Sequence, residues 1–533
     1  MTLDERLRKK DYDGIWETYC SFLDLTLEEY MNIQKSLMME QLQLYARCEL
    51  GKRLLGDRAP ASVQAFRETV KLTSYDDYAD ILLQKKEEAL PEKPAIWIQT
   101  TWEGGKNPVK VAPYTAGMIN GHRGNFLATL ILATSTARGE FSLRGKERFL
   151  YGMAPLPYLT GIIPPVLEGE LSVRFLPSQK EAERMSFSQR NKEGFKLGMR
   201  KGIDLFFGLS SVIVRMSESF AAGGTGGGGF NPAQNSLRMN ARMIKAWRRA
   251  KANGSSILPK DVWKLKGLIC SGTDTSHYKK KIEAYWGIRP TEIFGGTEPT
   301  CIGTEIWSKN GMVLFPDVCF YEFIPYREME KSLCDPGYQP KTYLMDELIE
   351  GETYELVISN FKGGAFLRYR VGDLFQCVSL KNEKDGIHVP QFAYVDRIPT
   401  VIDIAGFTRI TEGTITEAMA LSRLEIGDWF AVKRYDQEQR PYMQLCLETA
   451  GQTPVAMTRE IIKEHLTIYF KYVDNDYKDL KKMLGIDPLE IKILPRGTIG
   501  RYERSEGITL RKINPSPYDV TELLKLAASG GEG

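Results

Sequence analysis

The stretch that decides the fold is Phe294-Gly295-Gly296-Thr297-Glu298, which follows an apolar run. In order, the stretch contains an aromatic residue, two glycines, a residue with a hydroxyl group and a residue with a carboxylate. An aromatic ring suits stacking on a base, a threonine hydroxyl can donate to a phosphate, and a carboxylate oxygen is the hard ligand that Mg²⁺ prefers. The same five residues also suit a buried strand end with a capping threonine and a solvated glutamate. The stretch therefore predicts a nucleotide site only together with its surroundings.

A turn upstream of this stretch supplies groups that suit phosphates. Thr100 and Thr101 have hydroxyl groups, and Gly104 and Gly105 have sterically open backbone amides. Lys106 or Lys110 can provide a cation. Backbone N–H groups and a lysine in such a turn can cradle phosphate oxygens. A glycine hairpin with solvated lysines is the alternative for this turn taken alone.

A carboxylate downstream completes the pattern. Asp373 follows Gly372 after the segment from Tyr354 to Arg370, and Asp396-Arg397 comes next. We expect Asp373 at a strand end, where its carboxylate can accept both ribose hydroxyls, although a structural turn aspartate is the alternative. Adenylation of a carboxylate moves charge onto phosphate oxygens, and this charge must be met by N–H groups, hydroxyls, a cation and Mg²⁺. The three features occur in the order this chemistry needs.

Composition excludes several other classes of protein. With 42% hydrophobic and 26% charged residues, the 533-residue chain is typical of a soluble globular protein. Lys+Arg of 71 against Asp+Glu of 68 gives no field that argues for a nucleic acid or an acidic membrane surface. The start lacks the pattern of a signal peptide, and the apolar runs are too short to cross a bilayer. Eight scattered cysteines and four histidines give no disulfide framework and no zinc-ligand spacing. We therefore expect a cytoplasmic protein without a membrane or nucleic-acid partner.

The chain is too long for one core, so we expect two domains. Residues 1–90 carry helical periodicity, and strand-like and helix-like pieces then alternate to about residue 390, which predicts an α/β domain with mixed β-sheets flanked by helices over 1–395. The remainder, 396–533, has the expected strands and helix of a small, mobile α+β lid. The glycine tract Gly223–Gly229 follows a segment, 206–222, that reads as helical, so we expect a surface loop there and not a phosphate cradle, which needs a preceding strand.

Several motifs together resemble those of the acyl-adenylate-forming enzymes, and specifically those of the Gretchen Hagen-three family of acyl-acid amido synthetases, particularly its bacterial members. The resemblance extends over nearly the whole chain. It is carried by Thr100 to Lys110 with Pro113, Gly202 to Ser211, Cys270-Ser271-Gly272-Thr273, Phe320 to Pro325, Tyr354 to Ile358, Tyr369 to Asp373, Pro495 to Ile499 and Ile508 to Pro515.

The resemblance implies a ligase that uses ATP and Mg²⁺ in two steps. An acyl acid is adenylated, and the amine of an amino acid then displaces AMP to form an amide. It also implies a monomer whose small domain swings about a hinge near Arg397 to Gly406.

The resemblance further assigns roles to residues. Thr100, Thr101, Gly104, Gly105 and Lys110 would face phosphates, and Ser271, Gly272, Thr273 and Phe294 would frame adenine. Thr297 would lie at the phosphates, Glu298 would hold Mg²⁺, and Asp373 would hold the ribose. Gly295 and Arg397 would also bind the nucleotide. Lys512 or Arg501 would be the catalytic cation.

The phosphate turn departs from the family pattern. Trp102 and Glu103 stand where a glycine and a hydroxyl residue are usual, and a carboxylate beside a polyphosphate is repelled unless a cation lies between. Arg501 stands where many adenylate formers have a lysine. Two alternatives therefore stay open: an adenylate former that passes the acyl group to a thiol of coenzyme A or a carrier protein, and a non-catalytic relative. The apolar segments 153–166 and 205–220 are candidates for the acyl pocket, or else core helices.

Overall fold

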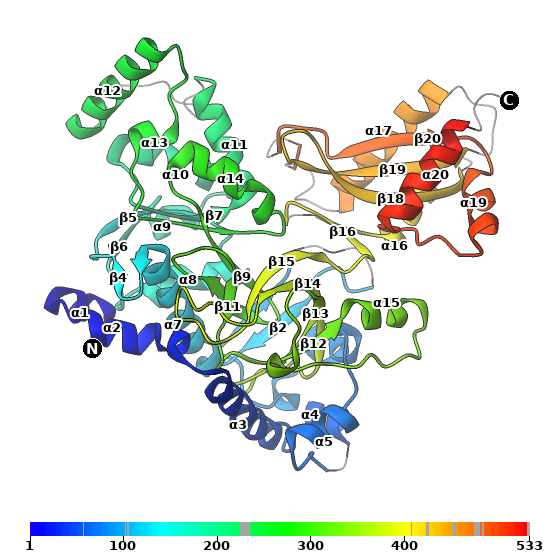
Figure 1. Cartoon of the computed structure of the whole chain (residues 1–533), viewed down its shortest axis with the longest axis horizontal. Coiled ribbons are helices and arrows are strands. Elements are labelled where there is room, and N and C mark those ends of the chain that lie inside the picture. Colours follow the sequence, from blue (N-terminus) through cyan, green and yellow to red (C-terminus); the bar gives the residue numbers. More distant parts are fainter. Residues whose placement is uncertain are drawn as a thin grey trace. The chain divides into compact units, whose positions relative to one another are not determined.

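The computed structural model forms two compact units (Figure 1), of which the first comprises Met1–Thr100 with Lys110–Asp396 and the second comprises Thr101–Val109 with Arg397–Gly533. The structure describes residues 1–56, 58–101, 103, 106–223, 235–406, 408–422, 426–449, 455–473, 480–481 and 484–529. Residues 101–109, from the middle of the predicted phosphate turn, thus belong to the second unit by their contacts.

One sheet of eleven strands organises the first unit. Its strand order is β12-β13-β14-β15-β11-β10-β9-β8-β7-β5-β6. The five strands from β9 to β6 are parallel, and the pairs β9–β10, β10–β11, β11–β15, β12–β13 and β13–β14 are antiparallel. The bounds are β5 Glu147–Gly152, β6 Val173–Leu176, β7 Leu205–Leu209, β8 Gly267–Ser271, β9 Thr291–Gly296, β10 Thr300–Glu305, β11 Met312–Leu314, β12 Cys319–Pro325, β13 Thr353–Asn360, β14 Tyr369–Ser379 and β15 Gln391–Arg397. The predicted mixed α/β fold is confirmed.

Two short hairpins and the helices complete this unit. The hairpins pair β1 (Ile96–Gln99) with β2 (Val111–Tyr114), and β3 (Ser135–Ala137) with β4 (Glu140–Phe141). The helices are α1 Leu3–Lys9, α2 Tyr12–Tyr19, α3 Leu27–Tyr45, α4 Glu49–Leu55, α5 Val63–Thr69, α6 Ala79–Leu82, α7 Ala116–Ala133, α8 Ile163–Leu167, α9 Gln179–Ala182, α10 Phe187–Lys201, α11 Ser210–Ala221, α12 Leu237–Asn253, α13 Pro259–Val262, α14 Thr275–Trp286 and α15 Tyr326–Cys334.

Helix α3 shows how the amino-terminal helices attach to the sheet. Thr26 and Glu29 form a reciprocal capping box at its start. Two glutamines on its inner face are buried, and their amides reach the backbone beside the sheet: Gln34 Nε2 donates to the carbonyl of Cys319 at 2.8 Å, and Gln41 Oε1 accepts from Gly363 N–H at 2.9 Å. Because these buried amides are hydrogen-bonded, the cost of removing them from water is offset, and they fix the helix beside the sheet.

One segment differs from its predicted structure. Residues 206–222 read as helical in the sequence, but Leu205–Leu209 is strand β7 and the helix α11 begins at Ser210. A short apolar run in a parallel sheet is buried on both faces and so lacks the alternation that identifies a strand. The run Leu205 to Leu209 therefore looks like the first turn of a helix. Most of the glycine tract that follows, from residue 224, lies outside the described residues.

The second unit is a small α+β body. Strand β19 pairs antiparallel with β18 and parallel with β20, and β16 pairs with β17. The elements are β16 Val401–Ile404, β17 Thr408–Thr411, α16 Glu412–Ser422, β18 Ile426–Tyr435, β19 Pro441–Thr449, α17 Val455–Val473, β20 Leu489–Leu494, α19 Thr498–Glu506 and α20 Pro517–Ser529.

Candidate active site

The predicted stretch Phe294 to Glu298 forms the end of β9 and the tight turn into β10. A Cβ atom on Gly295 would lie 2.6 Å from the carbonyl oxygen of Thr300, so this position requires glycine. Thr300 itself adopts a left-handed conformation with a φ of 65°. Such strain in a residue other than glycine needs support from its surroundings. The turn places Thr297 and Glu298 at the carboxyl end of a parallel strand, where ligands bind in open α/β sheets.

Glu298 is a buried carboxylate held from several sides. Glu298 is only 8% exposed to solvent, and its Oε1 accepts a hydrogen bond from the Tyr369 hydroxyl at 2.9 Å. Its backbone carbonyl accepts from Asn360 Nδ2 at 3.0 Å, and the carbonyl of Thr297 accepts from the Tyr114 hydroxyl at 2.7 Å. Among the described residues no donor faces the second oxygen of Glu298, so this oxygen can serve as a metal ligand.

The Glu298 carboxylate contributes to a raised pKa in two further tyrosines. Burial, and then the Glu298 carboxylate, raise the pKa of Tyr114 well above its usual 10. Burial raises the pKa of Tyr75 to about 12, a hydrogen bond from Val111 N–H lowers it, and Glu298 adds to the rise. Both phenols therefore stay protonated beside the carboxylate near neutral pH. A group of neutral hydroxyls around one buried carboxylate is an environment that a divalent cation would complement.

The base of the predicted phosphate turn meets this turn. Thr297 Oγ1 is 3.4 Å from the carbonyl of Gln99 at the end of β1. The next residue, Thr100, is buried and pairs with Lys110 twice: its N–H donates to the Lys110 carbonyl, and its Oγ1 accepts from Lys110 N–H, both at 2.9 Å. Lys110 Nζ lies 5.9 Å from the centre of the Tyr75 ring. The structure thus brings Thr100, Lys110, Thr297 and Glu298 together.

The rest of that turn lies in the second unit. Thr101 is partly exposed there, whereas Trp102, Gly104 and Gly105 lie outside the described residues. Glu103 Oε2 lies 3.3 Å from Arg409 Nη1 and 3.9 Å from Arg397 Nη1. The partners of the unusual Glu103 carboxylate are thus arginines of its own unit, which the sequence did not predict.

Asp373 lies in an aromatic cluster with Phe294. The predicted position at a strand end is wrong: Asp373 lies within β14, which begins at Tyr369 and runs on to Ser379. It is buried, and its Oδ1 accepts from the Tyr394 hydroxyl at 3.1 Å. The Tyr394 ring stacks on Phe294 with centroids 5.4 Å apart. The sequence alone does not show that β13 ends at Asn360 and that a new strand begins at Tyr369.

The predicted adenine-side residues follow β8. Ser271 ends the strand, and Gly272 has a φ of 118°, a conformation that L side chains rarely adopt. Thr275 Oγ1 donates to the Gly272 carbonyl at 2.7 Å and holds the turn through Thr273. Since β8 and β9 are parallel neighbours, Ser271 to Thr273 and Phe294 lie at the same edge of the sheet.

The two candidate cations occupy different parts of the second unit. Lys512 Nζ forms an ion pair with Asp428, and its backbone carbonyl accepts from Ala431 N–H in β18. Arg501 lies on α19, where its Nη2 donates to Thr498 Oγ1 at 3.2 Å. The Glu448 carboxylate accepts from the N–H groups of Gly497 and Ile499 at the start of this helix, both at 2.6 Å. This anchor could not be predicted from the sequence, because Glu448 lies about fifty residues upstream of α19.

Arg368, beside the predicted site, has a structural function. It forms two hydrogen bonds with Glu322, at 2.7 and 3.0 Å, and its Nη1 donates to the backbone carbonyls of Arg67 and Val70. The motif Arg368-Tyr369-Arg370 therefore contributes its tyrosine to Glu298 and its first arginine to the core.

The site suits a Mg²⁺ ion whose ligands come partly from the protein and partly from the substrate. Within the described part of the chain no group of three or more His, Cys, Asp or Glu side chains is placed to hold a metal. Mg²⁺ is commonly bound by one or two carboxylates together with substrate phosphates and water, and Glu298 meets that need.

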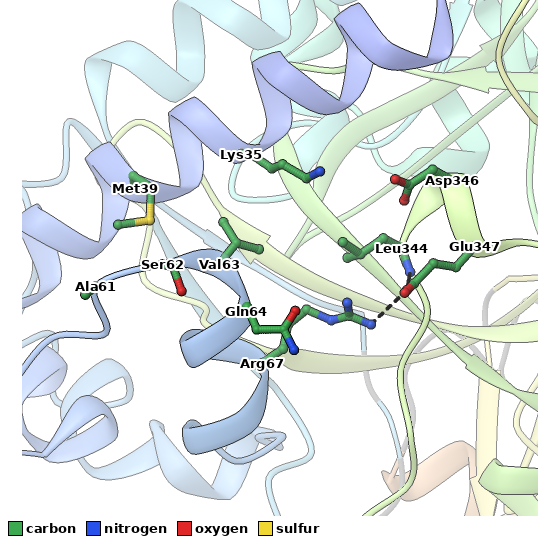
Figure 2. A pocket seen from close by; sticks show the side chains of 10 residues that line it. All are labelled: Lys35, Met39, Ala61, Ser62, Val63, Gln64, Arg67, Leu344, Asp346 and Glu347. Atoms are coloured by element: carbon green, nitrogen blue, oxygen red, sulfur yellow. Dashed lines mark hydrogen bonds and ion pairs between the residues drawn. The ribbon is translucent and has the colours of Figure 1, made fainter.

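A pocket of about 520 Å³ lies elsewhere in the first unit, between α3, α5 and residues 344–347 (Figure 2). Arg67 and Glu347 pair at its wall, and none of the predicted site residues lines it.

Parts of the chain are similar to known proteins. The GH3 family central domain matches residues 312–397. Indole-3-acetic acid-amido synthetase GH3.10 of Arabidopsis thaliana is 27% identical over 248 residues, 43% of this chain and 40% of that protein. Jasmonoyl–L-amino acid synthetase JAR4 of Nicotiana attenuata is 29% identical over 268 residues, 46% of this chain and 44% of that protein. The chain thus spans less than half the length of these curated relatives.

A solved structure shows the same fold. It is 2-hydroxyisobutyryl-CoA ligase in complex with 2-HIB-AMP and CoA, with a TM-score of 0.55 and 13% identity over 89% of this chain and 88% of that one. In the described part of this chain no helix has the length and apolar character needed to cross a membrane. The matched central domain and the two synthetases support the resemblance to the GH3 family that the motifs carry.

Proposed function

We propose that this protein is an ATP-dependent, AMP-forming ligase that joins an acyl acid to an amino acid. In the first step a carboxylate oxygen attacks the α-phosphate of ATP, and pyrophosphate leaves. In the second step the amine attacks the acyl carbonyl, AMP leaves with the bonding electrons, and the amine loses a proton. Products are an amide, AMP and pyrophosphate. The amido synthetases among the relatives support the choice of an amine as the acceptor.

The observation that carries this proposal is the buried Glu298 beside Thr297 and the Thr100–Lys110 pair. One of its oxygens is fixed by Tyr369, and the other faces no donor among the described residues. Such a carboxylate would hold Mg²⁺, which supplies charge neutralisation for the phosphates of ATP when bound. Thr297 and Lys110 would meet phosphate oxygens on the same side, and Asp373 with Phe294 would receive the nucleoside.

The second unit is proposed as the mobile lid, with the Lys512 ammonium or the Arg501 guanidinium as the cation that acts on the transition state. Lys512 is paired with Asp428, so that its ammonium is oriented before any substrate binds. A lid that delivers a cation only during one step would raise the rate of that step without strengthening ATP binding. All eight cysteines are free thiols, which supports a reducing compartment such as the cytoplasm, and we expect a monomer there.

The test is ATP–pyrophosphate exchange with a panel of carboxylic acids, followed by addition of amino acids or coenzyme A and identification of products by mass spectrometry. Glu298→Gln should reduce exchange about a hundredfold, the usual scale for loss of one electrostatic group. Glu352→Gln, an exposed glutamate of the same unit, is the matched control and should exchange normally. An unchanged rate in Glu298→Gln would contradict the Mg²⁺ assignment.

Two further variants separate binding from catalysis. Asp373→Ala should raise the KM for ATP. Lys512→Ala should keep the ATP-dependent thermal stabilisation, which at ligand about a hundred times its Kd corresponds to about 2.7 kcal/mol, while adenylate formation falls. A thioester product would favour transfer to a thiol. Absence of both ATP stabilisation and product in the wild type would favour the non-catalytic relative.

A further inference from the structure

Helix α12 (Leu237–Asn253) concentrates positive charge that the chain as a whole does not show. Its seventeen residues contain no acid and six cations, namely Arg238, Arg242, Lys245, Arg248, Arg249 and Lys251. The whole chain carries a formal net charge of only +3. In Figure 1 the helix lies at the edge of the first unit, near α13.

The same helix exposes large apolar side chains. Its inner face is formed by Met239, Ala246 and Ala250, which are buried. On the outside, Leu237 is 89% exposed, Trp247 55% and Ile244 47%. Leu237 and Ile244 are seven residues apart and Trp247 follows three residues later, so the three side chains share one side of the helix. Alpha-helices of globular proteins usually have one apolar stripe, and α12 has two.

The outer stripe continues into a groove. Ile244, Trp247 and Met243 line a pocket of about 640 Å³ together with Phe220 at the end of α11 and Ile257 after α12. The apolar surface therefore extends beyond single exposed residues. Contiguous apolar surface with a polar rim marks a site that contacts a partner or a membrane.

Most of the cations beside this stripe have no acidic partner among the residues that the structure describes. Arg249 lies 3.7 Å from Asp261, and Arg242 Nη1 is 3.4 Å from the carbonyl of Val262. Within the described residues no ion pair is made by Arg238, Lys245, Arg248 or Lys251, although Lys251 Nζ lies 5.1 Å from the Trp247 ring centre. Charges left without a partner at a surface are available to an anionic one.

The cationic surface extends past the start of α12. Ser236, the residue that caps the helix, also lines a pocket of about 520 Å³ whose other walls include Lys146, Arg148, Arg174 and Lys201. Arg148 is paired with Asp204, but the other three lysine and arginine side chains add to the local charge. Cations thus run from this pocket along α12, beside the apolar stripe.

We propose that α12 docks the protein on a membrane surface that contains anionic phospholipids. Leu237, Ile244 and Trp247 would enter the boundary between headgroups and acyl chains, and the flanking lysines and arginines would contact the lipid phosphates. Helices that lie in the membrane interface combine lysines and arginines with Trp and Leu, and α12 presents both kinds of residue on its exposed side. Such docking requires no membrane-crossing helix, and the low net charge of the chain does not oppose it because screening limits each charge to about 8 Å at physiological salt.

The charge and the apolar stripe together favour a lipid surface over other anionic partners. A nucleic acid or an acidic protein would use the cations but would leave Leu237 in water. A second copy of this chain would cover the apolar stripe but would bring two sets of six cations together. An anionic bilayer satisfies both features at once, because its headgroups are charged and its interior is apolar.

The experiment is co-sedimentation of the full chain with vesicles of phosphatidylcholine alone and of phosphatidylcholine with 30% phosphatidylserine. We expect binding to the second kind only, reduced at least tenfold by 0.5 M NaCl. Lys245→Glu with Arg248→Glu should reduce binding at least tenfold. Trp247→Ser should also weaken it and remove a vesicle-induced blue shift of the tryptophan fluorescence.

The matched control carries the same charge change elsewhere on the first unit, as Lys280→Glu with Lys384→Glu, both exposed, and should bind as the wild type does. Circular dichroism verifies that each variant is folded. Equal loss in the control pair, equal binding to uncharged vesicles, or no binding of the wild type would overturn the proposal. So would light scattering that shows a dimer dissociated by Trp247→Ser, since this would assign the surface to a second copy. The outcome does not depend on catalysis, because ATP and acyl acid are absent.

Discussion

His122 should make the folded protein sensitive to acid. It lies on α7 (Ala116–Ala133), whose inner residues are almost all buried, and it is itself only 3% exposed. Neither of its ring nitrogens has a hydrogen-bond partner in the described part of the chain. Burial lowers the pKa of the imidazole from its usual 6.5 to about 4. The folded protein therefore holds His122 neutral where an unfolded chain would protonate it.

The size of the effect follows from proton linkage. Between pH 6.5 and pH 4 the unfolded chain binds more protons at this residue than the folded one, so the free energy of unfolding falls as the pH falls. With a folded pKa of about 4, His122 alone should remove about 2 kcal/mol of stability between pH 7 and pH 5. Above pH 7 it should have no pH-dependent effect. His122→Leu should abolish this loss, and at pH 7 it should stabilise by about 1 to 3 kcal/mol because two unpaired polar atoms are removed.

The assay is urea unfolding at pH 7 and pH 5, followed by tryptophan fluorescence, for wild type and His122→Leu. His465→Leu, at an exposed position of α17 in the second unit, is the control and should lose stability with acid as the wild type does. An independent measurement is an NMR titration of the histidine Cε1–H signals, in which the signal that is lost in His122→Leu should not titrate above pH 5. The reasoning fails if the wild type and His122→Leu lose the same stability, or if the His122 signal titrates above pH 5.

Two further changes test groups beside the candidate site. Arg368→Met should destabilise by about 3 to 5 kcal/mol in urea unfolding, since it removes two hydrogen bonds to the buried Glu322 and leaves this carboxylate with Thr342 and the more distant Arg67. Arg53→Met, which breaks an exposed pair with Asp80, should cost less than about 1 kcal/mol. Equal effects of the two variants would contradict the structural assignment. Tyr369→Phe removes the hydroxyl that fixes Glu298, which is worth about 1.5 to 3 kcal/mol for a hydrogen bond to a charged group. Pyrophosphate exchange in Tyr369→Phe should therefore fall roughly tenfold to a hundredfold at low Mg²⁺ with little loss of stability, and an unaltered Mg²⁺ dependence would remove Tyr369 from the site.

The sequence predicted those parts of the site that lie on one short stretch or at one edge of the sheet. Phe294 to Glu298 could be recognised because glycine is required by the tight turn and the polar residues follow it directly. That this stretch lies at the same edge of the sheet as Ser271 to Thr273 follows from the parallel pairing of β8 and β9, because the carboxyl ends of parallel strands share an edge. Strand β7 was missed because a strand buried on both faces has no alternating pattern.

Side-chain partners from distant segments could not be predicted. Tyr369 reaches Glu298 across seventy-one residues, and Arg368 reaches Glu322 across forty-six. Nothing in the local sequence distinguishes the tyrosine that binds Glu298 from the other tyrosines of the core. These pairings depend on sheet register, which is set by the packing of the whole sheet and not by any single motif.

The charge of Glu103 bears most directly on whether the altered phosphate turn can work. A lone carboxylate beside a polyphosphate would be repelled, since two like charges 4 Å apart at a protein surface repel each other by about 4 kcal/mol. Glu103 is not alone: it lies within ion-pair distance of Arg397 and Arg409, and Arg409 also pairs with the buried Asp403 at 3.1 Å. Two carboxylates and two guanidinium groups give this cluster no net charge. The substitution therefore adds no net negative charge to the second unit, and the cost of a carboxylate in this turn is met by arginines that the same unit supplies.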